Sequence, residues 1–245
     1  MSNTDSVFVE QSTWLDIQQA LNFNRICVVP IGASCKEHGP HLPLNSDYVQ
    51  ARWLAEQVAT LFSVIVWPVI SAGYYPAFVE YPGSWSISEE TFTHSTLDII
   101  ESIGRHGDNR IVLLNTGIST INPLQAAIDQ SEFRSRLTLI NVYSGEHTEK
   151  VIKEIEQQRR GGHADEVETS IMLAIDPSSV QMEHARPGLE DIQKGPLNRE
   201  NPAQPNYSPS GSMGNPTLAN ANKGKKILAA ILEDISVQME QILRK

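Results

Sequence analysis

The sequence has few cysteines and few basic residues, and each shortage excludes a class of protein. Only two of the 245 residues are cysteines, Cys27 and Cys35, so a disulfide framework is excluded. Both fall in one short segment, which fits reduced thiols. Reduced thiols are typical of the cytoplasm, so we expect a cytoplasmic location. Lysine and arginine total 19 against 29 acidic residues, a net charge of −10. A basic face for phosphates is therefore missing, and we expect no nucleic-acid partner.

Long hydrophobic runs are also missing. No window reaches the roughly 18 consecutive apolar residues of a membrane span, so no membrane association is expected. Residues 1–11 are polar and acidic, unlike a secretory signal. Hydrophobic residues still make up 40% of the chain, which suffices for a core. We expect one domain spanning residues 1–245.

Short apolar runs alternate with segments of helical periodicity. This alternation predicts an α/β fold with three layers, α/β/α, and a mostly parallel central sheet. Ligands of such folds bind at the carboxyl ends of the strands. Residues 186–215 are rich in Pro, Asn, Ser and Gly and predict an irregular loop at the rim of the site. The expected strands are 26–31, 64–70, 111–114 and 137–142. Helices are expected after residue 47, at 88–105, from residue 123, from residue 167 and at 222–245.

A first cluster of polar residues follows the first expected strand. It contains Glu37, His38, His41 and Asp47, the nitrogen and carboxylate donors that zinc or manganese favours. Glycine and prolines in this segment impose irregular backbone, so the side chains can converge on a metal ion. The plainer interpretation is a solvated turn with incidental histidines. Cys35 as a nucleophile is a weaker hypothesis, because no paired base accompanies it.

The same segment resembles the signature of the creatininase family, Glu-x-His-Gly-x-His followed by an aspartate. The resemblance implies a creatininase-like fold and a pair of divalent ions, with His38 and Asp47 among the ligands. Lys36 stands where the family pattern has its glutamate. The chain has one extra residue before His38, which a β-bulge would accommodate by re-aiming Glu37, so Glu37 is predicted as a ligand. His41 would hold substrate or a carboxylate that orients a ligand, with a structural role equally open.

A second cluster, at residues 115–120, departs from that family. Its members have Asn-Gly-His-x-x-Asn here, with a metal-binding histidine and in some a glutamate two residues later. Gly117 and Ser119 occupy those two positions, so the chain is identified as a divergent member of the family. One ion could survive, or Gly117, Ser119 and Thr120 could form a pocket that binds the substrate or an oxyanion. The same residues are equally compatible with a loss of catalysis, or with a plain turn capped by Ser119 or Thr120.

A third cluster begins the helix expected near residue 167. Asp165 and Glu166 are typical partners of a helix dipole. Glu168 precedes a nearly continuous apolar run, so its carboxylate should be half-buried and need a cation as a partner. The segment is similar to the family's His-x-x-x-x-Glu-Thr-Ser, which implies proton transfer or substrate polarisation by His163 and a place near the metal for Glu168.

The resemblance extends over the chain from about residue 7, through the turn at 81–84 and the segment 211–219. It implies a metal-dependent hydrolase of a non-peptide C–N bond in a small, cyclic amide, with His163 and Glu168 catalytic. We expect Zn, or else Mn or Fe, as one or two ions. A small-molecule substrate and a homo-oligomer, a hexamer by resemblance, are expected. Two rival functions are a non-catalytic binding relative and a metal-dependent lactone hydrolase or isomerase.

Overall fold

The computed structural model describes residues 6–23, 25–193 and 195–244. Its sheet contains five parallel strands in the order β1-β3-β2-β4-β5. The long central strands β2 and β4 pair from Cys27 with Ile111 to Ile31 with Asn115, so their carboxyl ends coincide. The strands are β1 (Val7–Phe8), β2 (Ile26–Ile31), β3 (Val64–Val66), β4 (Ile111–Asn115) and β5 (Leu137–Asn141).

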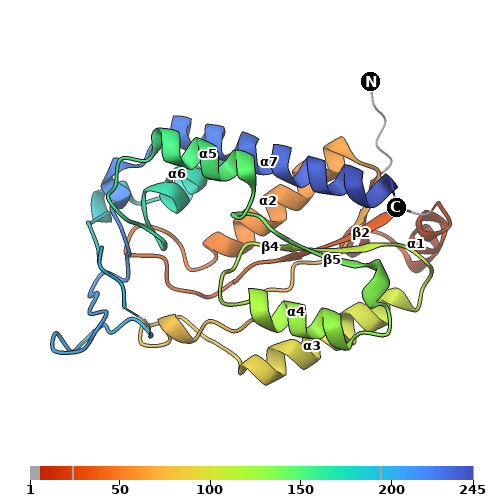
Figure 1. Ribbon diagram of the computed structural model, residues 1–245, viewed down its shortest axis with the longest axis horizontal. Coiled ribbons are helices and arrows are strands. Elements are labelled where there is room, and N and C mark those ends of the chain that lie inside the picture. The colour runs from red at the N-terminus through yellow and green to blue at the C-terminus, as the bar shows by residue number, and fades with distance from the viewer. Residues whose placement is uncertain (1–5, 24, 194, 245) are drawn as a thin grey trace.

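Helices cover both faces of this sheet (Figure 1). One face packs against α2 (Ser46–Leu61), α5 (Glu146–Ile155), α6 (Glu166–Ile175) and α7 (Ala221–Arg244). The other packs against α1 (Trp14–Leu21), α3 (Glu89–Gly104) and α4 (Ile121–Gln130). The predicted three-layer α/β/α fold with a parallel sheet is therefore confirmed. Among the described helices, none combines the length and the apolar character that crossing a bilayer requires.

Strand β2 shows why these residues form a buried central strand. Its six residues are all buried, and Ile26 and Val28 face one hydrophobic cluster while Cys27 and Val29 face the other. A strand buried on both faces needs apolar side chains in every position, which its sequence supplies.

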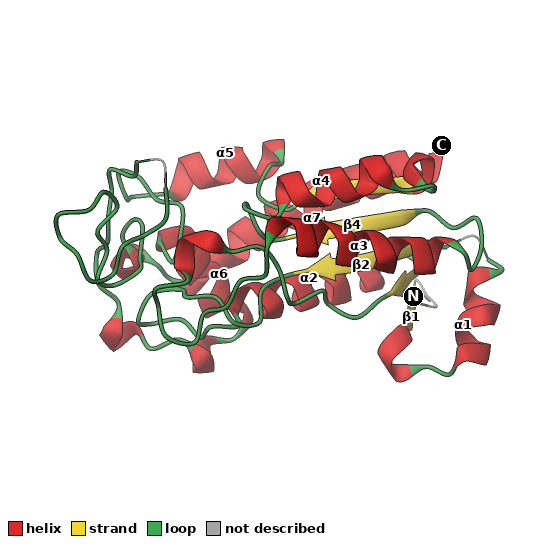
Figure 2. Ribbon diagram, turned by 90° about the horizontal axis from the view of Figure 1, so that it is seen from below, coloured by secondary structure: helices red, strands yellow, loops and turns green. Residues whose placement is uncertain are grey.

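Two local expectations were wrong. The strand expected at 64–70 ends at Val66, because Pro68 cannot donate to the ladder. The β-bulge expected before His38 is not formed, since β2 ends at Ile31 and the next helix begins at Ser46. Glu37 therefore lies in the loop between β2 and α2. Long irregular segments of the chain gather at one end of the molecule (Figure 2). The described residues of 186–215 also form loops, with no helix or strand assigned to them.

Gly224 lets α7 cross α6 at close range. A Cβ atom at this position would lie 1.8 Å from the carbonyl oxygen of Ser170 on α6. Alanine is the better helix former by about 1 kcal/mol, but here the helices would have to separate, at a cost of about 3 kcal/mol. We expect Gly224→Ala to lower the melting temperature and Lys225→Ala, on the exposed side, to leave it nearly unchanged. An equal or higher melting temperature for Gly224→Ala would contradict this packing.

Asp234 of α7 holds the first turn of α5. Its Oδ1 accepts from the backbone and ring of His147, at 3.1 and 2.8 Å, and its Oδ2 accepts from the backbone and hydroxyl of Thr148, at 2.8 and 2.7 Å. Burial opposes the charged carboxylate, but these hydrogen bonds outweigh it and lower the pKa of Asp234. The same contact raises the pKa of His147.

These shifts predict a bell-shaped pH dependence of stability. The lowered pKa of Asp234 gives stability that is present above about pH 4 and is lost as the pH falls through the folded value. The raised pKa of His147 gives stability that is present below about pH 6.5 and is lost as the pH rises through the folded value. Asp234→Asn should therefore lower the free energy of unfolding most between these limits, by about 1–3 kcal/mol. Urea unfolding from pH 3 to 8 tests this, with Glu240→Gln as control, and a pH-independent difference would contradict it.

Candidate metal centre

Three segments meet at the carboxyl edge of the sheet around a cavity of about 430 Å³. They are the loop after β2, the turn after β4 and the loop that begins α6. This is where ligands bind in parallel α/β folds, and the volume is in the range of small-molecule sites. Side chains that matter for its chemistry include Lys36, Phe78, Ser119, Tyr143, His163 and Glu168.

His38 is fully buried at the start of this site and faces two acceptors. Its Nδ1 lies 2.8 Å from the carbonyl oxygen of Lys36, and its Nε2 lies 2.9 Å from Oδ1 of Asp47. A carbonyl oxygen only accepts, so Nδ1 carries the hydrogen and Nε2 of the neutral ring keeps a lone pair. A lone pair that faces a carboxylate requires a cation at that nitrogen, either a proton or a metal ion.

His163 is oriented in the same way by two carboxylates. Its Nε2 lies 3.0 Å from Oε2 of Glu37, and its Nδ1 lies 3.6 Å from Oε2 of Glu168. Ala164 lies in the turn between His163 and Glu168 and has a left-handed φ of 47°. Its backbone N–H donates to Oε2 of Glu168 at 2.6 Å. Backbone in this region is costly for alanine, and such strain is concentrated at functional sites.

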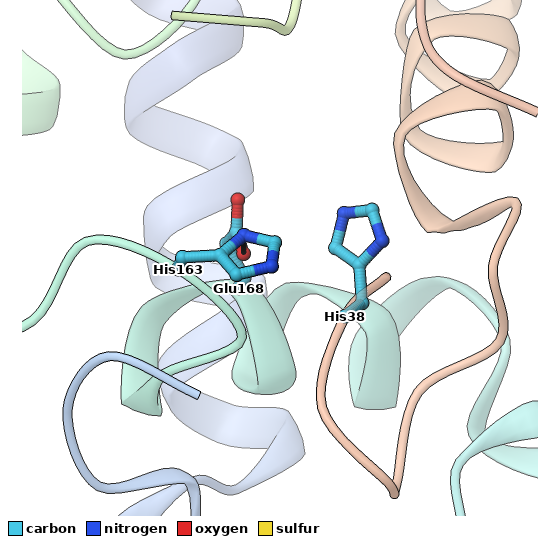
Figure 3. A group of neighbouring side chains, drawn as sticks. All are labelled: His38, His163 and Glu168. Carbon is cyan, nitrogen blue, oxygen red and sulfur yellow. Dashed lines mark ion pairs between the residues drawn. The ribbon is translucent and has the colours of Figure 1, made fainter. Parts of the chain in front are cut away.

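Donor atoms of His38, His163 and Glu168 all lie within 4.8 Å of one another. In Figure 3, His163 and Glu168 lie together, opposite the ring of His38. Two imidazole nitrogens and one carboxylate oxygen form a donor set that suits zinc, with room for water in the remaining position. Burial raises the pKa of Glu168 above its usual range, although His163 opposes the shift, so this carboxylate lacks full compensation by the described residues.

Lys36 brings a positive charge into the same site. Its Nζ lies 2.7 Å from Oδ2 of Asp47, with both side chains almost entirely buried. Burial works against the charged ammonium, but Asp47 and Glu168 prevail and raise the pKa of Lys36. Burial likewise opposes the charge on Asp47, yet Lys36 and His38 hold the pKa of that carboxyl well below its usual range.

The charges at the site suit one divalent ion. Glu37, Asp47 and Glu168 carry three negative charges and Lys36 one positive charge, which leaves −2 with neutral histidines. Asp165 is left out of this sum because it caps α6 and accepts from the backbone N–H groups of its first turn, although burial outweighs these bonds and raises its pKa. A single divalent ion, or one proton on each histidine, neutralises the remainder. The residues present therefore fit one ion, whereas two would leave an excess positive charge.

Comparison with known proteins identifies the family. A sequence model described as creatininase, creatinine amidohydrolase, matches residues 10–238, nearly the whole chain. The chain belongs to the creatininase family. The membership expected from the sequence is thereby confirmed.

Several relatives of this family are hydrolases by name. The chain is 26% identical to a 3-dehydro-scyllo-inosose hydrolase of Thermotoga maritima, covering 100% of this chain and 86% of the relative. It is 24% identical to a creatinine amidohydrolase of Pseudomonas putida, covering 94% and 95%. A mycofactocin precursor peptide peptidase of Mycobacterium tuberculosis is 25% identical over 84% and 81%.

Solved creatininase structures share the fold. A type II creatininase point mutant superimposes with a TM-score of 0.85 at 24% identity, covering 96% of this chain and 98% of that one. The structure titled creatininase Mn gives 0.83 at 23% identity over 96% and 98%. A mutant of Zn-Zn type also gives 0.83, at 24% identity over 96% and 98%.

The turn after β4, where the creatininase pattern has a metal-binding histidine, forms hydrogen bonds among its own residues. Asn115 accepts from the backbone N–H of Gly117 at 3.1 Å and from the hydroxyl of Thr120 at 2.8 Å. Ser119 lines the cavity but donates to the carbonyl oxygen of Tyr74 at 2.6 Å. Thr120 is the N-cap residue of α4, yet its side chain makes no capping hydrogen bond. These contacts favour a structural turn, and substrate binding by Ser119 and Thr120 stays a prediction.

Other predicted residues lie behind the cavity wall. The described residues that line the cavity include His163 and Glu168 but not Glu37, His38, His41, Asp47 or Thr120. Glu37 contacts His163, and Asp47 contacts His38 and Lys36, so these carboxylates adjoin the donor group of His38, His163 and Glu168. Coordination of a metal by Glu37 and Asp47 stays a prediction. His41 has its Nε2 2.7 Å from the hydroxyl of Thr169, and burial lowers its pKa to about 4.

Three residues of the site were missed by the sequence analysis. The ring of Phe78 packs 4.3 Å from that of His163, and Tyr143 lines the cavity with burial keeping its pKa well above the usual value. Tyr143 could have been found, since it follows a strand at its carboxyl end. Lys36 was noticed only as a departure from the family pattern. Nothing in the sequence marks Phe78.

Proposed function

We propose that this chain is a metal-dependent hydrolase that opens a C–N bond in a small, cyclic amide with a single divalent ion. The observation that carries the proposal is the group of His38, His163 and Glu168, whose donor atoms lie within 4.8 Å of one another beside a cavity. The names of its relatives support hydrolysis, and the Mn and Zn-Zn titles of the structural neighbours support a divalent metal. The cyclic amide follows from the creatinine amidohydrolase relative.

The ion would be held by Nε2 of His38, Nδ1 of His163 and the carboxylate of Glu168. Zinc suits this donor set best, with manganese or iron as substitutes. When bound, such an ion supplies a water molecule with a near-neutral pKa and polarises a carbonyl group. In the sequence-based hypothesis Glu37 and Asp47 are also ligands; here they would act next to the ion, through the histidines and Lys36.

Protein groups around the site fix the histidines and close the cavity. The carbonyl oxygen of Lys36 and the carboxylate of Glu37 accept from the outer nitrogens of His38 and His163, which sets each tautomer and ring direction. The ring of Phe78 packs on that of His163. Tyr143 keeps its proton and donates to Gln50. Hydrolysis adds water across the C–N bond and yields a carboxylate and an amine.

A second candidate is a binding protein without turnover. Its support is Lys36, an ammonium group where the family pattern has a metal-binding glutamate, together with Gly117 in the position of the metal-binding histidine. A lactone hydrolase that keeps the ion is the third candidate, because ring opening of an ester needs the same groups. A homo-oligomer stays a prediction by family resemblance.

One screen separates these functions. Protein freed of metal by a chelator and reloaded with Zn or Mn would be incubated with five- and six-membered cyclic amides and their lactone counterparts. We expect ring opening of at least one amide, absent from the chelated sample. Opening of lactones alone would favour the lactone hydrolase. Binding of a cyclic amide without turnover in the loaded protein would favour the binding protein and contradict the proposal.

A further inference from the structure

We propose that the ammonium group of Lys36 is a fixed cation that takes the place of a second metal ion and binds the carbonyl oxygen of the substrate. This inference rests on the proposed hydrolase function and assigns a role to a residue that the family pattern does not contain. Lys36 lines the cavity, and its side chain is only 8% exposed.

The ammonium has hydrogen-bonding capacity that the described residues do not use. Nζ lies 2.7 Å from Oδ2 of Asp47, which accounts for one of its N–H groups. Its other near neighbours are the rings of Phe78 and Tyr75, with centroids at 5.1 and 5.9 Å. An ammonium carries three N–H donors, and leaving the other two unpaired in a buried place is costly. An acceptor oxygen of a bound ligand would satisfy them.

The substitutions in the two family motifs point the same way. The family pattern has a glutamate, which attracts a cation, where this chain has the cationic Lys36. The ammonium of Lys36 lies against Asp47, which the resemblance places among the metal ligands. Gly117 removes a further donor from the second motif. Because Lys36 and one divalent ion together neutralise Glu37, Asp47 and Glu168, the site needs no second ion.

The position suits the chemistry of amide hydrolysis. Water adds to the carbonyl carbon, the carbonyl oxygen takes on negative charge, and the C–N bond then breaks as the nitrogen gains a proton. A donor fixed beside that oxygen acts mainly on the transition state, and losing one such donor lowers kcat about 100- to 1000-fold. Lys36 keeps its proton throughout and stabilises the oxygen by charge and hydrogen bonding. It is therefore a catalytic residue in this account.

The test combines metal content with kinetics for three variants. Elemental analysis after loading with excess Zn should give about one equivalent for wild type and for Lys36→Met. Lys36→Glu should give about two, because four carboxylates are then neutralised by two divalent ions. In steady-state kinetics, Lys36→Met should lose about 100- to 1000-fold in kcat with little change in KM, and Lys36→Arg should retain more activity than Lys36→Met.

The outcomes distinguish this inference from the proposed function. Two equivalents in wild type, or one equivalent in a folded Lys36→Glu, would overturn the role of Lys36 while leaving hydrolysis intact. Wild-type kcat in Lys36→Met would do the same. If wild type binds no ion or opens no ring, the proposed function fails, and uptake of ions by Lys36→Glu alone would still support the cationic role. Circular dichroism of each variant shows whether it is folded.

Discussion

Replacing His38 with alanine is expected to release the bound ion and to lower kcat/KM about 1000-fold. Its Nε2 is one of three donor atoms that lie within 4.8 Å of one another, and two remaining donors hold zinc poorly. A bound ion contributes several kcal/mol to stabilising the transition state, and each 1.4 kcal/mol is about tenfold in rate. Metal analysis and kinetics on the reactive amide test both effects.

A matched control is available on the opposite side of the sheet. His94 lies exposed on α3, so His94→Ala removes an imidazole without touching the site. It should keep wild-type metal content and activity. Retention of a full equivalent of metal by folded His38→Ala would show that the ion is held elsewhere.

Replacing His163 with asparagine should have a comparable effect and also distinguishes two roles for this residue. As a ligand, with Nδ1 beside Glu168 and Nε2 on Glu37, His163 should take the ion with it when it is removed. As a proton carrier, the role implied by family resemblance, its loss should leave the ion in place and lower kcat about 100- to 10,000-fold. We expect loss of the ion.

Glu37→Gln is expected to lower metal affinity less than His163→Asn does. Glutamine keeps the size of the side chain but loses the charge that orients His163. The expected cost in metal affinity is about 10- to 100-fold, as for other groups that orient a ligand, rather than complete loss. A full equivalent of metal in His163→Asn, with a changed pH profile of kcat, would contradict the ligand assignment and support proton transfer.

Much of the fold could be predicted because the strands are strongly patterned. The apolar runs at 26–31 and 111–114 have no helical period and lie between amphipathic segments, so a buried parallel sheet was the consistent solution. Strand ends were less accurate: the run 64–70 looked continuous, but the strand ends at Val66, two residues before Pro68.

The candidate site could be predicted by segment but not by atom. All three clusters lie at the carboxyl edge of the sheet, and parallel topology explains this for the first two, which directly follow β2 and β4. The direction of each side chain depends on loop contacts that have no sequence period, such as the bond from Glu37 N–H to Ser84 and the positive φ of Ala164. Such contacts bring Glu37 to His163, whereas the sequence favoured direct coordination.

Lys36 illustrates the limit of motif comparison. A motif shows which ligands are absent, but it does not show what occupies their place. Only the structure shows that the ammonium lies 2.7 Å from Asp47 and that Lys36 lines the cavity. The position of the absent glutamate therefore carries a positive charge.

Anomalous diffraction from crystals of the zinc-loaded protein tests the central claim most directly, because it locates each ion. We expect one peak, in contact with His38, His163 and Glu168, with the ammonium of Lys36 still paired with Asp47. A second peak beside Asp47, or no peak near His38 and His163, would contradict it.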